Sequence, residues 1–235
     1  YITSVVLGNE QTTLIIPATI EDIPVVGIED NAFKENQEIT AVTIPEGIVS
    51  IGERVFELCK NLQNITLPQS LRSIGFAAFC DCHSLEEITL PTRLSGTLNG
   101  SLLQNCTSLQ EITIPQGITE LGGWAFCGCT NLEQIHFASD SELTTIGRQV
   151  FTDCTSLESI EIPESFTTIS YDSFKNCTSL TDVYFLGDVS NVTFINWDDV
   201  QYNAWQGCAD ITFHAFADFY KGTFADFIEQ AAPVY

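Results

Sequence analysis

Residues 59–68 read CKNLQNITLP, and residues 74–82 read IGFAAFCDC. They hold two apolar phrases, C-x-x-L-x-x-I-x-L-P and I-G-x-x-A-F-x-x-C, which return along the chain about every 23 residues. One unit of this length cannot close a hydrophobic core on itself, so it must bury its inner face against its neighbours. The sequence therefore predicts a stack of similar turns, that is, a solenoid.

The repeat can be followed position by position. A large residue recurs at steps of 23, 23, 24, 23, 25, 23 and 31 residues, which predicts about eight turns. Its members are Phe33, Phe56, Phe79, Leu103, Phe126, Phe151, Phe174 and Trp205. Three residues later come Asn36, Cys59, Cys82, Cys106, Cys129, Cys154, Cys177 and Cys208. Five residues earlier come Ile28, Ile51, Ile74, Leu98, Leu121, Ile146, Ile169 and Val200.

A short strand is predicted in every turn. Ile65-Thr66-Leu67 and its relatives alternate apolar and polar side chains and are rich in β-branched residues, a pattern typical of strands. The spacing from Trp205 predicts His214 at the inward strand position of the last turn and Phe216 at the next inward position. The stretch from Ile51 to Cys59 is too compact for a long helix and predicts a short edge strand followed by a helical turn.

These phrases resemble the repeats of the BspA-like family of leucine-rich repeat proteins, over about residues 28–216. The resemblance implies a right-handed leucine-rich-repeat solenoid of about eight turns, with parallel β-strands on one face and short strands and helical turns elsewhere. Members are typically bacterial or protozoan surface and secreted proteins, several of them linked to adhesion. The resemblance therefore implies an extracellular or cell-surface location. Repeats of this kind share no catalytic residues.

A stack of turns exposes apolar surface at both ends unless it is capped. Residues 14–17 (LIIP) repeat the strand phrase, so residues 1–22 are predicted to form a partial repeat that caps the first turn. Residues 23–216 are the predicted solenoid. Residues 217–235, which contain several phenylalanines, are the predicted C-terminal cap.

The charge balance restricts the partners. Eight Lys and Arg residues stand against 31 Asp and Glu residues, which gives a formal charge of −23. This field repels phosphate groups, so we expect neither nucleic-acid binding nor attraction to anionic membranes. The sequence has no apolar run near the ~18 residues of a membrane span. The chain starts at Tyr1 and contains no Met, so we expect any export signal to lie outside these residues.

The nine cysteines suggest disulfides or a metal site, but the repeat accounts for seven of them as buried, free thiols at one position of the turn. Cys80 and Cys127 are additional and form Cys-x-Cys pairs with Cys82 and Cys129. The two pairs lie two turns apart, which is about 10 Å, too far for a disulfide between Cys80 and Cys127. We therefore expect no metal site.

Catalytic chemistry is not predicted. His83, His136 and His214 occupy different positions of the turn and share no nucleophile, whereas a catalytic triad needs convergent groups. The sequence contains no phosphate-binding glycine loop or zinc-protease motif. We therefore expect neither a catalytic residue nor a cofactor, and the protein is not predicted to be an enzyme.

The outward strand position carries the predicted binding surface. Its members are Thr43, Thr66, Thr89, Thr113, His136, Glu161 and Tyr184. Threonine suits any exposed β position, whereas the change to His, Glu and Tyr is typical of recognition surfaces. The predicted patch consists of Thr113, His136, Glu161 and Tyr184.

The predicted function is a non-catalytic binding module, on a cell surface or secreted, that engages a host or neighbouring-cell protein or glycan through the sheet face. The alternative is a structural spacer that presents another domain and has no ligand of its own. Exposed aromatic residues clustered on one face would favour binding, because a spacer has no need of them. The sequence leaves the ligand and the oligomeric state open.

Overall fold

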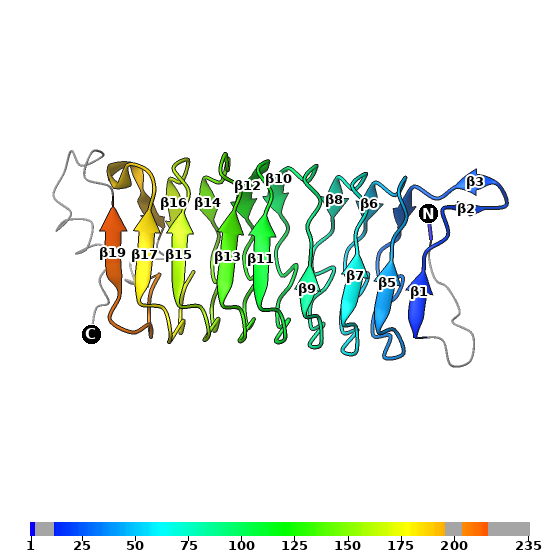
Figure 1. Ribbon diagram of the computed structural model, residues 1–235, viewed down its shortest axis with the longest axis horizontal. Coiled ribbons are helices and arrows are strands. Elements are labelled where there is room, and N and C mark those ends of the chain that lie inside the picture. The colour runs from blue at the N-terminus through cyan, green and yellow to red at the C-terminus, as the bar shows by residue number, and fades with distance from the viewer. Residues whose placement is uncertain (3–11, 196–203, 216–235) are drawn as a thin grey trace.

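The computed structural model describes residues 1–2, 12–195 and 204–215. Within them the chain winds into an elongated solenoid with a front and a back row of parallel strands (Figure 1). The front row is β1 (Thr13–Ile15), β5 (Ala41–Thr43), β7 (Asn64–Thr66), β9 (Glu87–Ile88), β11 (Glu111–Ile114), β13 (Gln134–Phe137), β15 (Ser159–Ile162), β17 (Asp182–Phe185) and β19 (Thr212–Ala215).

The back row is made of shorter strands that enter each corner. They are β4 (Gly27–Ile28), β6 (Ser50–Ile51), β8 (Ser73–Ile74), β10 (Gly96–Leu98), β12 (Ile118–Leu121), β14 (Thr145–Ile146), β16 (Thr168–Ser170) and β18 (Thr193–Ile195). Two further elements lie outside the rows: an antiparallel hairpin of β2 (Thr19–Ile20) and β3 (Ile23–Pro24), and a 3-10 helix, η1 (Val189–Asn191).

The strand register confirms the predicted solenoid. Val42 pairs with Ile65, and Ile160 pairs with Val183, so equivalent residues of successive turns lie side by side. Seven complete turns run from β1 to β17, and the next turn reaches β19 through residues 196–203, which lie outside the described residues. The predicted C-terminal cap, residues 217–235, also lies outside them. The predicted boundary at residue 22 falls inside the β2–β3 hairpin.

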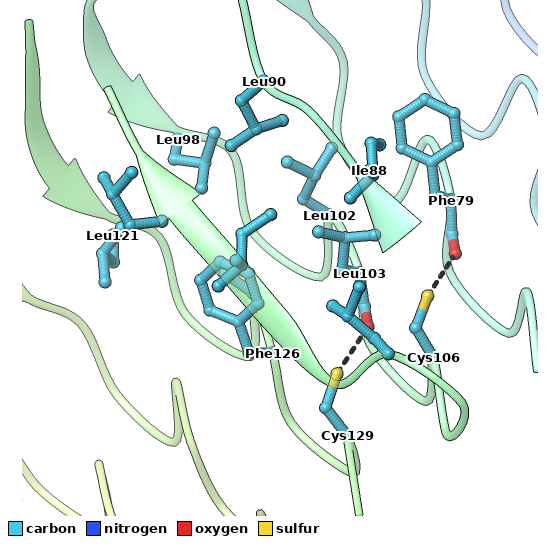
Figure 2. Close-up of a cluster of buried hydrophobic side chains, with 14 of the residues drawn as sticks. Phe79, Ile88, Leu90, Leu98, Leu102, Leu103, Cys106, Leu121, Phe126 and Cys129 are labelled. Carbon is cyan, nitrogen blue, oxygen red and sulfur yellow. Dashed lines mark hydrogen bonds between the residues drawn. The ribbon is translucent and has the colours of Figure 1, made fainter. Parts of the chain in front are cut away.

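Stacked aromatic rings fill the corner side of the core. The rings of Phe33 and Phe56 lie 5.4 Å apart, and those of Phe56 and Phe79 lie 5.6 Å apart. Leu103 interrupts the stack, which continues from Phe126 to Trp205. Each buried ring contributes about 1.5–3 kcal/mol through burial alone. Figure 2 shows how leucine and isoleucine side chains of three consecutive turns fill the space beside these rings.

The cysteine position ties each turn to the one before it. The Cys106 thiol donates to the Phe79 carbonyl (3.2 Å), and the Cys129 thiol donates to the Leu103 carbonyl (3.1 Å), as Figure 2 shows. The same bond recurs from Cys59 to Cys208. A buried carbonyl without a partner is costly, so the thiol completes the hydrogen bonding of the corner.

The corners differ in detail from the predicted helical turns. Residues two before and two after the large residue have positive φ, for example Arg54 (54°) and Leu58 (63°) on either side of Phe56. A left-handed residue cannot continue a right-handed helix. Each corner is therefore a set of tight turns, and η1 is the one helical segment within the described residues.

The predicted register of the last turn was wrong by one residue. Phe213, and not His214, pairs with the inward Val183, while His214 pairs with the outward Tyr184. The segment from Trp205 to β19 is one residue shorter than in the preceding turn, and the shift places a phenylalanine rather than a histidine against the core. In the back row Phe194 pairs with Ile169. Val200 and Phe216, predicted for inward positions, lie outside the described residues.

Glycine at the entry to the corner is required by the close approach of successive turns. A Cβ on Gly75 would lie 2.4 Å from the carbonyl carbon of Gly52, and one on Gly147 would lie 2.7 Å from the Leu121 carbonyl oxygen. These contacts are with backbone atoms, which cannot rotate away.

We expect Gly75→Ala to lower the free energy of unfolding by about 2–3 kcal/mol, because the added methyl group must push two turns apart. Gly123→Ala is the matched control, since a Cβ there would lie 3.1 Å from Cγ and 3.3 Å from the carbonyl oxygen of Arg148, both much longer than the backbone contacts at Gly75; it should cost less than about 1 kcal/mol. Urea unfolding followed by circular dichroism measures both changes. Equal stability of Gly75→Ala and the native chain would contradict this packing.

Candidate functional site

The front row of strands is interrupted twice. Hydrogen-bonded pairing runs from β1 to β9, from β11 to β13 and from β15 to β19, but it does not join β9 to β11 or β13 to β15. The back row remains continuous behind the second interruption, because β14 pairs with both β12 and β16. At the second interruption, therefore, pairing is lost in the front row and kept in the back row.

Extra residues in the turn accompany each interruption. The turn from Phe79 to Leu103 has 24 residues and the turn from Phe126 to Phe151 has 25, against the usual 23, and in both turns an interruption follows the front strand. After β13 the extra residues form a tight bend in which the Ser141 amide donates to the Ala138 carbonyl (3.0 Å). The longer insert after β17 does not interrupt pairing, because it forms η1 apart from the front row.

A cleft of about 810 Å³ lies between β13 and β15. Its apolar part includes Phe137, which is half-buried, whereas the equivalent Ile114 and Ile162 of the neighbouring turns are fully buried. Asp140, Glu161 and Glu164 bring carboxylates to its walls. None of the described residues that line it is a lysine or an arginine. The cleft therefore combines an apolar surface, open strand edges and negative charge.

The four residues of the predicted patch lie on this face as two pairs. Thr113 is the register partner of His136, and Glu161 is the register partner of Tyr184. His136 and Glu161 both line the cleft, from opposite sides. Thr113 and Tyr184 lie one strand further out, so the structure places the cleft in the middle of the patch.

His214 extends this surface and was missed because the expected register put it inside. Its ring stacks on Tyr184 with centroids 4.3 Å apart and planes 9° apart. Its Nε2 lies 2.7 Å from Oδ1 of Asp182. The hydrogen bonds from His214 and Thr181 hold the pKa of Asp182 below its ordinary value. Tyr184, which is 36% exposed, thus has one face of its ring against His214.

The cysteines form no second site. All nine are free, and no group of three or more potential metal ligands occurs among the described residues. Burial raises the pKa of the Cys59 thiol to about 12 and that of the Cys127 thiol to about 11. Cys208 differs, because hydrogen bonding with the neighbouring Cys177 lowers its pKa. Most of these thiols are therefore protonated and unreactive at neutral pH.

The described residues contain no helix that is long and apolar enough to cross a membrane. Stacked turns of about 23 residues, each with an inward Leu or Ile and most with a Phe at the corner, define a solenoid of the leucine-rich-repeat class. A model of the BspA type leucine-rich repeat region matches residues 26–141 and 96–221, with six copies of the repeat. The chain belongs to this family.

Solved structures of bacterial repeat proteins have a similar fold. A leucine-rich repeat protein of T. pallidum is 26% identical, with a TM-score of 0.51 over 66% of this chain and 81% of that chain. A leucine-rich cell surface protein of Faecalibacterium prausnitzii is 19% identical, with a TM-score of 0.56 over 88% of this chain and 69% of that chain. No curated protein matches the sequence.

We expect thiol labelling at pH 8 to separate the folded from the unfolded chain. In the folded chain the raised pKa values leave little thiolate, so a colorimetric disulfide reagent should react slowly with the buried cysteines. In guanidinium chloride the pKa values return to about 8.5, and nine thiols should react at once. Fast reaction of most thiols without denaturant would contradict the burial of the recurring cysteines.

Proposed function

We propose that this chain is a non-catalytic binding module, on a cell surface or secreted, and that its ligand is a protein or glycan held on the front face at the cleft between β13 and β15. The cleft carries the proposal, because the front sheet opens there while the back row stays paired behind it, and because His136 of β13 and Glu161 of β15 both line it. Binding sites in proteins are typically concave, with an apolar surface and a few polar groups.

The chemistry of the cleft favours a protein ligand with basic residues. Asp140, Glu161 and Glu164 carry negative charge, and the whole chain has a formal charge of −23. Such a field attracts positively charged partners over a distance of about 10 Å at moderate salt. His136 and the stacked Tyr184–His214 pair add aromatic surface at the same face, and aromatic residues are enriched where protein interfaces concentrate their binding energy.

A structural spacer is the competing proposal. It requires a regular stack and no recognition surface, and nothing about a spacer demands an interrupted front sheet. Aromatic residues at the outward position beside an acidic cleft support binding instead. The family match is compatible with either function.

Screening the purified chain against glycans and extracellular matrix proteins tests the proposal. Replacing His136, Glu161 and Tyr184 together by alanine should weaken capture of any ligand found by about 30-fold or more, because side chains at the centre of an interface cost about 1–2 kcal/mol each. Thr43→Ala with Thr66→Ala is the matched control at the same outward position of the N-terminal half, and should bind normally.

Two outcomes would count against the proposal. Unchanged capture by the triple variant would remove the cleft from the binding surface. The absence of any ligand among matrix proteins and glycans would favour the spacer. Thermal unfolding of each variant separates lost binding from lost folding.

A further inference from the structure

A second hollow, of about 570 Å³, lies on the edge where the back strands enter the corners. Its lining includes three aromatic residues, Phe76, Trp124 and Tyr171, together with Arg148. Phe76 is 36% exposed, and Trp124 and Tyr171 are partly exposed. Residues on β12, β14 and β16 also line the hollow, so it is distinct from the front cleft.

Two glycines make the hollow. Gly100 and Gly123 occupy, in successive turns, the position that Phe76, Arg148 and Tyr171 hold in the other turns. A Cβ on Gly100 would lie 3.4 Å from the Phe76 ring, and one on Gly123 would lie 3.1 Å from Cγ of Arg148. Without these side chains, the backbone of two turns forms the floor between Phe76 on one side and Trp124 with Arg148 on the other.

Hydrogen-bonding side chains of the hollow include Arg148 and Tyr171, beside Glu120, Thr145 and Ser170. The guanidinium of Arg148 lies 3.8 Å from the centre of the Trp124 ring and donates to the Tyr171 hydroxyl at 3.5 Å. A guanidinium has five N–H donors, so this arrangement leaves donors for a ligand. The indole N–H of Trp124 has no hydrogen bond among the described residues and is a further donor. The hollow thus offers apolar faces and fixed donors.

The aromatic residues are spaced by alternate turns. Phe76 precedes the Phe79 corner, Trp124 the Phe126 corner and Tyr171 the Phe174 corner. Turns that stack at about 4.8 Å place residues of alternate turns about 10 Å apart. A polyproline II helix repeats every three residues, with a rise of about 3.1 Å per residue, so that every third residue recurs about 9 Å further on. The two periods match closely.

Charge and hydrogen bonding indicate the same ligand. The polyproline II backbone makes no internal hydrogen bonds, so its carbonyls can accept from Arg148 and Trp124. Glu120 lines the hollow with its carboxylate half-exposed, and the chain carries a formal charge of −23. A segment with a basic residue beside its prolines is therefore complementary in charge.

We propose that this hollow binds a proline-rich segment of a partner protein in the polyproline II conformation. Proline rings rest on Phe76 and Trp124, while Arg148 and the Trp124 indole donate to the ligand's carbonyls. Aromatic-lined grooves recognise such segments in other proteins because the ligand is already extended and loses little entropy on binding. This site is independent of the front cleft.

Calorimetric titration with a polyproline peptide that ends in arginine tests the proposal. The native chain should bind it saturably, and a Gly/Ser peptide of equal length and charge should not bind. Trp124→Asn should weaken binding at least about tenfold; asparagine suits this position because it tolerates the positive φ of 60° found there. Phe76→Ser, at an exposed position, should have a similar effect, while Thr43→Ala should bind as the native chain does.

Three results would overturn the proposal. One is the absence of saturable binding of the polyproline peptide by the native chain. Another is equal affinity in the native chain, Trp124→Asn and Phe76→Ser, with both variants folded by circular dichroism. The third is binding of neutral oligosaccharides, but not of the peptide, that depends on the same residues, because the hollow would then be a glycan site.

Discussion

The backbone carbonyl of the large corner residue in each turn accepts a hydrogen bond from the next turn, and the rest of the structure depends on this bond. The Phe56 amide donates forward to the Ala78 carbonyl at 2.8 Å, and the Phe56 carbonyl accepts the thiol of Cys82 at 3.1 Å. These bonds hold neighbouring turns at strand spacing on the corner side, where rings also stack 5–6 Å apart. Gly75 is needed for the same reason, because any side chain there would separate the turns. The corner side is therefore uniform, and variation appears on the other sides of the turn.

The front sheet is where the solenoid can vary without losing its stack. Two extra residues after β13 are absorbed beside the strand, and pairing with β15 is lost while β14 and β16 stay paired behind it. The opening between β13 and β15 thus results from two features: the corners keep their spacing, and the connection after β13 contains extra residues. The back edge varies in another way. Gly100 and Gly123 have no side chain at a position that other turns fill, and this leaves the space between Phe76 and Trp124 open.

The sequence predicted the stack because each of the recurring positions in the repeat has one structural role. Phe, Cys and the inward Ile or Leu recur at fixed steps, and the strand register confirms that these residues lie side by side. The outward residues His136 and Glu161 were also predicted to share a face. The cleft between them was not predicted. The regular spacing of the repeat shows which residues are equivalent, but it does not show which backbone hydrogen bonds are lost where a turn contains extra residues. His214 was misplaced because one missing residue after Trp205 inverts the two faces of a strand. The hollow was not predicted, because its residues come from two positions of the repeat at which the residue type differs from turn to turn.

Amide hydrogen exchange tests most directly whether the front ladder is interrupted at the cleft between β13 and β15. The Glu133 amide donates to the Gln110 carbonyl at 2.8 Å, and the Thr181 amide donates to the Glu158 carbonyl at 3.0 Å. Glu158 holds the equivalent position beside β13, where within the described residues no such bond joins the strands. All three residues are exposed, so the hydrogen bond should decide the rate. The account predicts slow exchange at Glu133 and Thr181 and exchange at least about tenfold faster at Glu158. Equal protection of the three amides would contradict it, because β13 and β15 would then be paired and the cleft closed.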